Sequence, residues 1–314
     1  MRIAFVGKGG SGKTTLASLF ARYHSPRIKT FLFDADINQH LPHVLGIPKN
    51  NIKKIISLSQ KEKDIKKFIQ GKNSRIKKHA DIIKTTPPGK GSGIIYPSEK
   101  DNLLSQLSYP HESLHLLCAG EPTPEDTGIR CYHAKTGLVE LLLNHTHDTK
   151  DELITADMTA GADAFSSGLF TRFDLTCIVV EPTHQSLRVY EQYFTESQKH
   201  DVALAVIGNK IHDETDKLFL QKNIRQEHLL AFFPFSSFVR SIEKGAPQKI
   251  TTLTHKEKDV LEKIFKRLAL QKRNWSDYLK KAHYFHIKNA QSWANETKGM
   301  TLEHQIDPDF SFLS

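Results

Sequence analysis

Residues 7–14 read Gly7-Lys8-Gly9-Gly10-Ser11-Gly12-Lys13-Thr14 and fit the pattern G-x-x-x-x-G-K-[ST]. The apolar run at 2–6 predicts a buried strand before this stretch, and residues 14–23 have the apolar spacing of a helix after it. Glycines let a loop curl until its N–H groups converge on an anion, which the positive end of the next helix also faces. The stretch therefore predicts a phosphate-binding loop, formed by Gly9, Gly10, Ser11, Gly12, Lys13, Thr14 and Thr15.

Within such a loop, two side chains have defined tasks. Lys13 is expected to reach the β- and γ-phosphates, and the Thr14 hydroxyl is expected to bind Mg²⁺.

Strand and helix patterns alternate along most of the chain. Further strands are predicted at 28–33, 114–118, 152–156, 175–181, 202–208 and 231–233, and helices at 136–144, 185–200 and 256–295. Strands that alternate with helices form parallel sheets. We therefore expect an α/β fold with a mostly parallel, doubly wound sheet flanked by helices. The expected domain spans 1–268, and a C-terminal helical extension and tail span 269–314, with the end of the tail either a docking strand or a free peptide.

Residues 49–112 read as a basic insertion, part helix and part loop. Residues 49–84 contain twelve Lys/Arg and three Asp/Glu. These 36 residues therefore carry a net charge of +9, which equals the formal net charge of the whole chain. A solvated, lysine-rich helical insertion is the simplest interpretation, and an anionic partner such as nucleic acid, a lipid surface or an acidic protein is the alternative. Phe68 is the one aromatic residue in the segment, which weakens a base-stacking mode of nucleic-acid binding.

Composition excludes several classes of protein. Hydrophobic residues make up 38% of the chain, and no apolar run approaches the ~20 residues of a membrane span. The sequence has no pattern typical of a secretory signal, and three cysteines do not make a disulfide framework. Cys118 and Cys177 fall in predicted strands, where we expect inert core residues. A cytoplasmic protein is the expectation.

A second lysine, Lys8, stands early in the loop, and an ordinary phosphate loop needs only one. The pattern K-G-G-x-G-K-T-T resembles that of the deviant Walker A ATPases of the MinD/ParA group, which includes the CooC-like proteins. In that group the early lysine crosses the dimer interface and contacts the partner's phosphates. The resemblance implies that the chain binds ATP, forms a nucleotide-dependent homodimer, and uses Lys8 and Lys13 in catalysis.

Two acidic motifs resemble the switch segments of the same group. Asp34-Ala35-Asp36 follows the second strand, and the resemblance implies that Asp36 orients the attacking water. Asp157-Met158-Thr159-Ala160-Gly161 follows a later strand. There Asp157 is expected to hold Mg²⁺ through water, and the Gly161 N–H to sense the γ-phosphate.

Asn209-Lys210, at the end of another predicted strand, resembles the base-recognition motif of the group. An asparagine amide offers a donor and an acceptor to adenine. Guanine-specific relatives have an acid two residues after the lysine, where this chain has His212, so ATP is expected rather than GTP. Pro234 lies in a stretch that resembles the loop flanking the base.

Cys131-Tyr132-His133 precedes a helix that resembles the one after the C-x-C motif of CooC-like proteins. In those proteins two cysteines from each subunit bind one metal at the dimer axis. Here His133 replaces the second cysteine. Two copies would still offer a tetrahedral Cys₂His₂ site for Zn²⁺ or Ni²⁺; equally, the loop serves only as an interface.

Three functions stay open from the sequence. The first is an ATP-driven switch or metallochaperone acting on an unknown client protein. The second is ATP-dependent, nonspecific DNA binding through residues 49–84. The third is a small-molecule kinase or synthetase, against which Lys8 argues because such enzymes act largely in cis.

Overall fold

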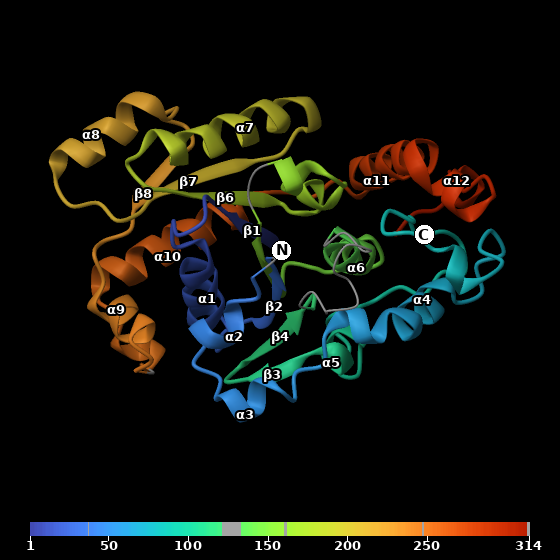
Figure 1. Cartoon of the computed structure of the whole chain (residues 1–314), viewed down its shortest axis with the longest axis horizontal. Coiled ribbons are helices and arrows are strands. Elements are labelled where there is room, and N and C mark those ends of the chain that lie inside the picture. The colour runs from blue at the N-terminus through green and yellow to red at the C-terminus, as the bar shows by residue number, and fades with distance from the viewer. Residues whose placement is uncertain (37, 121–132, 160–161, 247, 313–314) are drawn as a thin grey trace.

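The computed structural model describes residues 1–36, 38–120, 133–159, 162–246 and 248–312. Its centre is one eight-stranded sheet in the order β3-β4-β2-β5-β1-β6-β7-β8 (Figure 1). All neighbouring strands pair in parallel except β3 and β4. The strands are β1 (Arg2–Val6), β2 (Lys29–Ala35), β3 (Tyr109–His111), β4 (Leu114–Cys118), β5 (Glu152–Met158), β6 (Leu175–Val180), β7 (Leu204–Gly208) and β8 (Leu229–Phe232). The expected doubly wound α/β fold is confirmed.

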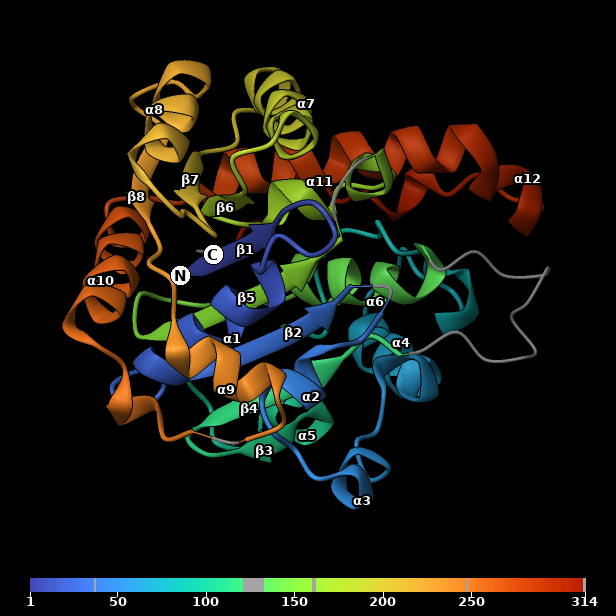
Figure 2. The same ribbon diagram turned by 60° about the vertical axis from the view of Figure 1, so that its left-hand side comes forward.

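Helices cover both faces of the sheet (Figures 1 and 2). On one face, α1 (Lys13–His24) and α10 (His255–Ala269) bury apolar side chains against β1 and β6. On the other face, α6 (His133–Asn144) and α7 (His184–His200) form the larger core. The remaining helices are α2 (Leu41–Val44), α3 (Lys49–Ile52), α4 (Glu62–Gln70), α5 (Leu103–Leu107), α8 (Glu214–Asn223), α9 (Ser237–Glu243), α11 (Trp275–Asn289) and α12 (Asn295–Lys298).

Among the features that differ from the sequence predictions are a helix break, a strand and a helix. The helix predicted over 256–295 is interrupted, because the Asn274 side chain accepts hydrogen bonds from the N–H groups of Ser276 and Asp277 and so begins α11 as a new helix. Strand β3 was not predicted, since its sequence Tyr-Pro-His has no apolar alternation and depends on antiparallel pairing with β4. Helix α8 was also missed, because its only buried residue is Leu220.

The basic insertion is part helix and part loop, as predicted, and it belongs to the main core. Leu58, Ile65 and Ile69 are fully buried in the same cluster as the strands of the sheet. Most of its basic side chains point to solvent, and Lys66 forms an ion pair with Glu62 one turn earlier. The insertion therefore presents a basic outer surface over an apolar inner one.

The C-terminal extension packs on the body of the protein, and residues 307–312 form no strand. His286 is fully buried, with its ring nitrogens 3.3 Å from the Thr85 hydroxyl and 3.0 Å from the Leu302 carbonyl. Farther along, the Phe312 ring packs 4.6 Å from Trp275, centroid to centroid. No helix among the described residues is long and apolar enough to cross a membrane.

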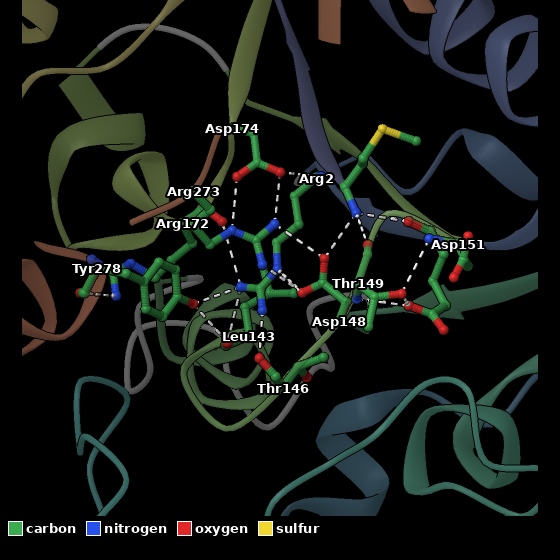
Figure 3. Close-up of polar contacts among 12 residues, drawn as sticks. Arg2, Leu143, Thr146, Asp148, Thr149, Asp151, Arg172, Asp174, Arg273 and Tyr278 are labelled. Atoms are coloured by element: carbon green, nitrogen blue, oxygen red, sulfur yellow. Dashed lines mark hydrogen bonds and ion pairs between the residues drawn. The ribbon is translucent and has the colours of Figure 1, made fainter. Parts of the chain in front are cut away.

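A buried cluster of charges fixes this extension to the start of β1 (Figure 3). Asp148 accepts a 2.7 Å hydrogen bond from Arg2 Nε and another of 2.7 Å from Arg273. Arg273 also reaches Asp174 at 2.6 Å, and Arg2 donates to the Tyr278 hydroxyl at 2.6 Å. Burial opposes ionisation of Asp148, but the guanidinium groups of Arg2 and Arg273 outweigh it and hold its pKa well below the ordinary value. The buried arginines and carboxylates therefore stabilise one another in their charged forms.

We expect Asp148→Asn to lower the free energy of unfolding by about 3–5 kcal/mol at pH 7, because it leaves two buried guanidinium groups short of a counter-charge. Since the pKa of Asp148 is lower in the folded protein, its stabilisation is present above the unfolded pKa of about 4 and is lost as the pH falls through the folded pKa. Urea unfolding at several pH values should show the variant and the wild type converging in acid.

The control is Lys280→Ala, which removes an exposed ion pair with Asp277 on the same helix. It should change the free energy of unfolding by less than about 0.5 kcal/mol. Equal effects of the two substitutions would contradict a stabilising role for the cluster.

Candidate functional site

The glycine loop joins the end of β1 to the start of α1. A Cβ at Gly7 would lie 2.4 Å from Ser11 Oγ and 2.6 Å from the Val179 carbonyl, so no larger residue fits. Gly12, directly before α1, has a φ of 93°, in the left-handed region that glycine adopts without strain. The Ser11 N–H donates to the Lys8 carbonyl at 3.0 Å and closes the turn. The loop thus surrounds the N-terminus of α1, where N–H groups and the helix dipole favour an anion.

Lys13 lies between carboxylates from two neighbouring strands. Its ammonium is 2.7 Å from Asp36 Oδ2, just after β2, and 3.9 Å from Asp157 Oδ1 on β5. Burial lowers the pKa of Lys13, but the charges of Asp157 and Asp36 outweigh it and raise the pKa above its ordinary value. Burial raises the pKa of Asp36, whereas Lys13 and the Asn38 N–H lower it, and the balance lies below the ordinary value. Lys13 and Asp36 are therefore a charged pair.

Asp157 has a different environment from Asp36. It is fully buried, and neither carboxylate oxygen accepts a well-aligned hydrogen bond from any described residue. Burial raises the pKa of its carboxyl to about 7, although the Lys13 ammonium opposes the shift. A hydrated divalent cation would supply both the missing hydrogen-bond donors and the missing charge. The donor set at this place, a carboxylate with the nearby Thr14 hydroxyl, fits Mg²⁺ that keeps several waters.

The Asn209 side chain faces the backbone of the glycine loop. Its Nδ2 donates to the Ser11 carbonyl at 2.7 Å. Next to it, Lys210 donates to the Gly10 carbonyl at 2.6 Å and forms an ion pair with Glu181 at 2.7 Å. Sequence reasoning missed the part played by Lys210 and Glu181, because only the adjacency of β6 and β7 brings them to the loop.

A cavity of about 800 Å³ opens beside the loop, large enough for a nucleotide. Of the predicted site residues, Gly9, Gly10, Gly12, Lys13, Thr14, Thr15, Asn209 and Pro234 line it. Its apolar walls include Phe233, Phe235, Val239 and Ile242, which belong to the stretch that resembles the loop and helix flanking the base. The other apolar residues of the wall, Leu16, Leu19 and Val44, were not predicted to lie there. The apolar residues of the wall come from α1, α2 and α9 and the segment before α9, so their common location depends on tertiary packing.

The remaining predicted residues are not all in the cavity wall. Ser11 is fully buried within the loop, and Asp36 and Asp157 contact Lys13. Gly161 and Cys131 lie outside the described residues, and His133 is described only as the first residue of α6. Among the described residues, no group of three or more His, Cys, Asp or Glu side chains could hold a metal ion by itself.

Lys8 differs from Lys13 in its surroundings. It is half-exposed near the tip of the loop, and its side chain makes no hydrogen bond or ion pair within the described part of the chain.

The fold and the loop together define a P-loop protein of the parallel α/β class, and comparison with known proteins specifies the family. No family model matches the chain. It is 30% identical over 271 residues to an uncharacterized ATP-binding protein of Methanocaldococcus jannaschii, covering 84% of this chain and 96% of that protein. It is 27% identical over 249 residues to the carbon monoxide dehydrogenase accessory protein CooC of Rhodospirillum rubrum, covering 78% and 88%.

A solved structure shows the same fold. The septum site-determining protein MinD from Pyrococcus horikoshii, complexed with Mg-ADP, superposes with a TM-score of 0.52 at 17% identity, covering 86% of this chain and 97% of MinD. The chain therefore belongs to the MinD/ParA family of P-loop ATPases and is similar to CooC.

We expect Gly12→Ala to destabilise the protein more than an ordinary glycine substitution does. A Cβ at Gly12 meets a positive φ and lies 2.4 Å from Asn209 Nδ2. Gly299 also has a positive φ, 63°, but nothing lies within 4 Å of its added Cβ. Gly299→Ala should therefore cost only the backbone strain of about 1–2 kcal/mol, and Gly12→Ala should cost more in urea unfolding.

The double variant Gly12→Ala/Asn209→Ala keeps the strain and, like a Gly12→Ala protein whose Asn209 side chain has turned away, lacks the hydrogen bond from Asn209 to the Ser11 carbonyl. It should therefore cost about as much as Gly12→Ala. Equal costs for the two glycine variants would contradict the close contact between Asn209 and the loop.

Proposed function

We propose that this protein binds ATP with Mg²⁺, hydrolyses it, and works as a switch that dimerises when ATP is bound. The observation that carries the proposal is the Lys13 ammonium at the phosphate loop, held against Asp36 at 2.7 Å and near Asp157 at 3.9 Å. Membership of the MinD/ParA family and the similarity to CooC support it.

The loop is suited to hold the phosphates. The backbone N–H groups of residues 9–15 would donate to phosphate oxygens, and Lys13 would move from Asp36 to the β- and γ-phosphates. Mg²⁺, when bound, would neutralise charge that builds up on the phosphates during transfer. Thr14 would hold it directly and Asp157 through a water.

Hydrolysis requires a group that orients water towards the γ-phosphorus. Once Lys13 has turned to the phosphate, Asp36 Oδ2 would accept a hydrogen bond from that water. Asp36 Oδ1 already accepts hydrogen bonds from the Asn38 N–H at 2.9 Å and from its side chain at 3.2 Å, which fixes the plane of the carboxylate. The water oxygen would form a new bond to the γ-phosphorus as the bond from this phosphorus to the bridging oxygen breaks, and that oxygen leaves with ADP. One water proton would stay on the phosphate formed and the other would pass to solvent. The N–H of Gly161 is assigned to sensing the γ-phosphate.

The base is assigned to the end of the cavity formed by Asn209, Pro234 and the apolar walls. An amide side chain can donate to and accept from adenine, and His212 occupies the place where guanine-specific relatives have an acid. We therefore assign ATP rather than GTP as the nucleotide.

The half-exposed Lys8 supplies the reason for dimerisation. Its ammonium would contact the partner's phosphates, where positive charge in trans stabilises the transition state as an arginine finger does. Hydrolysis would then require two subunits.

We expect Asp36→Ala to retain ATP without hydrolysing it, since the substitution removes the group that orients water and leaves the phosphate loop intact. Phosphate release should fall at least about 100-fold. ATP affinity should stay equal or increase, because Lys13 loses its competing carboxylate. The comparison variant is Lys13→Ala, which should lose ATP binding itself. A near-wild-type rate for Asp36→Ala would refute its role.

We expect the protein to be a monomer with ADP and a dimer with a non-hydrolysable ATP analogue and Mg²⁺. Lys8→Ala should lose the dimer and hydrolysis together, since no other residue of the loop tip carries a positive charge. Light scattering after size exclusion measures both states. A fully active monomeric Lys8→Ala would contradict the shared site.

The client of the switch would be a protein that binds the ATP-bound dimer. Within this proposal, two copies of Cys131 and His133 are candidates to bind Zn²⁺ or Ni²⁺ at the dimer axis. Metal analysis of the dimer fractions, with Cys131→Ser for comparison, separates a metallochaperone from a switch without metal.

Nonspecific DNA binding through residues 49–84 is the second candidate function. In its favour, Lys53, Lys54, Lys63, Lys67, Lys72, Arg75, Lys77 and Lys78 are all exposed. ATP-dependent retention of duplex DNA that falls steeply with salt would support it. A protein that stays monomeric and phosphorylates a small molecule would instead support the kinase alternative.

A further inference from the structure

We infer that Gln39 is a positioning residue that holds Asp36 in place for ATP hydrolysis and connects it to the end of β4. The inference rests on the proposed function, because it concerns how the water-orienting carboxylate is supported. Gln39 belongs to no motif of the phosphate loop and does not line the nucleotide cavity. Its side chain is nevertheless almost fully buried, with 5% exposed.

The Gln39 side-chain amide makes three hydrogen bonds with the backbone near the ends of β2 and β4. Its Nε2 donates to the Asp34 carbonyl at 3.0 Å and to the Asp36 carbonyl at 3.2 Å. Its Oε1 accepts from the Gly120 N–H at 3.3 Å. A single amide therefore uses both its donor and acceptor sides to tie two segments far apart in the sequence.

The backbone of Gln39 adopts a conformation that its residue type disfavours. Its φ is 49°, in the left-handed region where residues other than glycine are uncommon. Such strain persists only where the surrounding structure enforces it, and it is frequent at functional sites. Glycine would fit this backbone conformation better than glutamine. We therefore attribute the presence of glutamine here to the hydrogen bonds of its side-chain amide.

The segment on the far side of Gln39 is also closely fitted. Gly120 has a φ of 119°, and a Cβ there would lie 2.4 Å from Ser59 Oγ. The Ser59 N–H donates to the Ala119 carbonyl at 3.2 Å, and the Ala119 N–H donates to the Asp34 carbonyl at 3.0 Å. The end of β2, the end of β4 and the turn before α4 thus meet around Gln39.

Two variants test the amide apart from the strain. Gln39→Glu keeps the length of the side chain and the positive φ, but a carboxylate cannot donate to the two carbonyl oxygens. Gln39→Gly relieves the positive φ and removes the side chain altogether. We expect both to lower kcat for ATP hydrolysis about 10-fold to 100-fold, because Asp36 loses its support, with the Kd for Mg-ATP changed less than about 3-fold. Gln39→Asn, which keeps an amide and tolerates positive φ, should recover part of kcat.

The matched control is Asp201→Gly. Asp201 is an exposed residue at the end of α7 with a φ of 48°, remote from the site, so the variant relieves the same strain elsewhere and should leave kcat unchanged. If kcat stays at the wild-type value in both Gln39→Glu and Gln39→Gly, or if ATP affinity falls in step with kcat, the inference is overturned. Absence of hydrolysis by the wild-type protein would instead overturn the proposed function and the inference with it.

Discussion

The buried ammonium of Lys13 is the charge on which the functional edge of the sheet depends. Asp34 and Asp157 are register partners on adjacent parallel strands, and Asp36 follows two residues after Asp34. Burial and the Asp157 carboxylate together raise the pKa of Asp34 well above its ordinary value, which shows how unfavourable the acidic groups would be alone. Lys13 at the start of α1 counteracts that repulsion. The strand order brings the carboxylates together, and the loop and the start of α1 place the ammonium that stabilises them.

A second group of charges, at the other end of β1, stabilises the fold and is not part of the phosphate loop. Arg2 at the start of β1 is held in the cluster with Asp148, Asp174 and Arg273, whereas Gly7 after the end of β1 begins the phosphate loop. The charged groups of this Arg2 cluster are well satisfied by hydrogen bonds, and the cluster anchors the C-terminal extension (Figure 3). At the loop, by contrast, both oxygens of Asp157 have no well-aligned hydrogen-bond partner among the described residues. One strand thus separates an end built for stability from an end built to receive a ligand.

The sequence was most informative where function and local structure depend on neighbouring residues. The glycine loop and most strands follow from short apolar runs and from fixed spacings, and the structure confirms these elements. Strand β3, helix α8 and the break between α10 and α11 depend on pairing, weak burial and one capping side chain. In the site, the motif residues and the apolar stretch that flanks the base were predictable, but the cavity walls from α1 and α2 and the bridging role of Gln39 were not. Both require segments far apart in the chain to be packed together.

The geometry around Asp36 links binding to chemistry through competition. Lys13 carries one positive charge, so its ion pair with Asp36 would weaken as the ammonium moves toward the β- and γ-phosphates. Phosphate binding would therefore draw Lys13 away from Asp36 Oδ2, the atom assigned to orient water, only when a substrate is present. Weakening of this ion pair need not disorder the residue, because Asn38 holds Oδ1 and Gln39 holds the backbone carbonyl. The same ion pair that stabilises the empty site would thus keep its water-orienting group inactive until ATP takes the lysine.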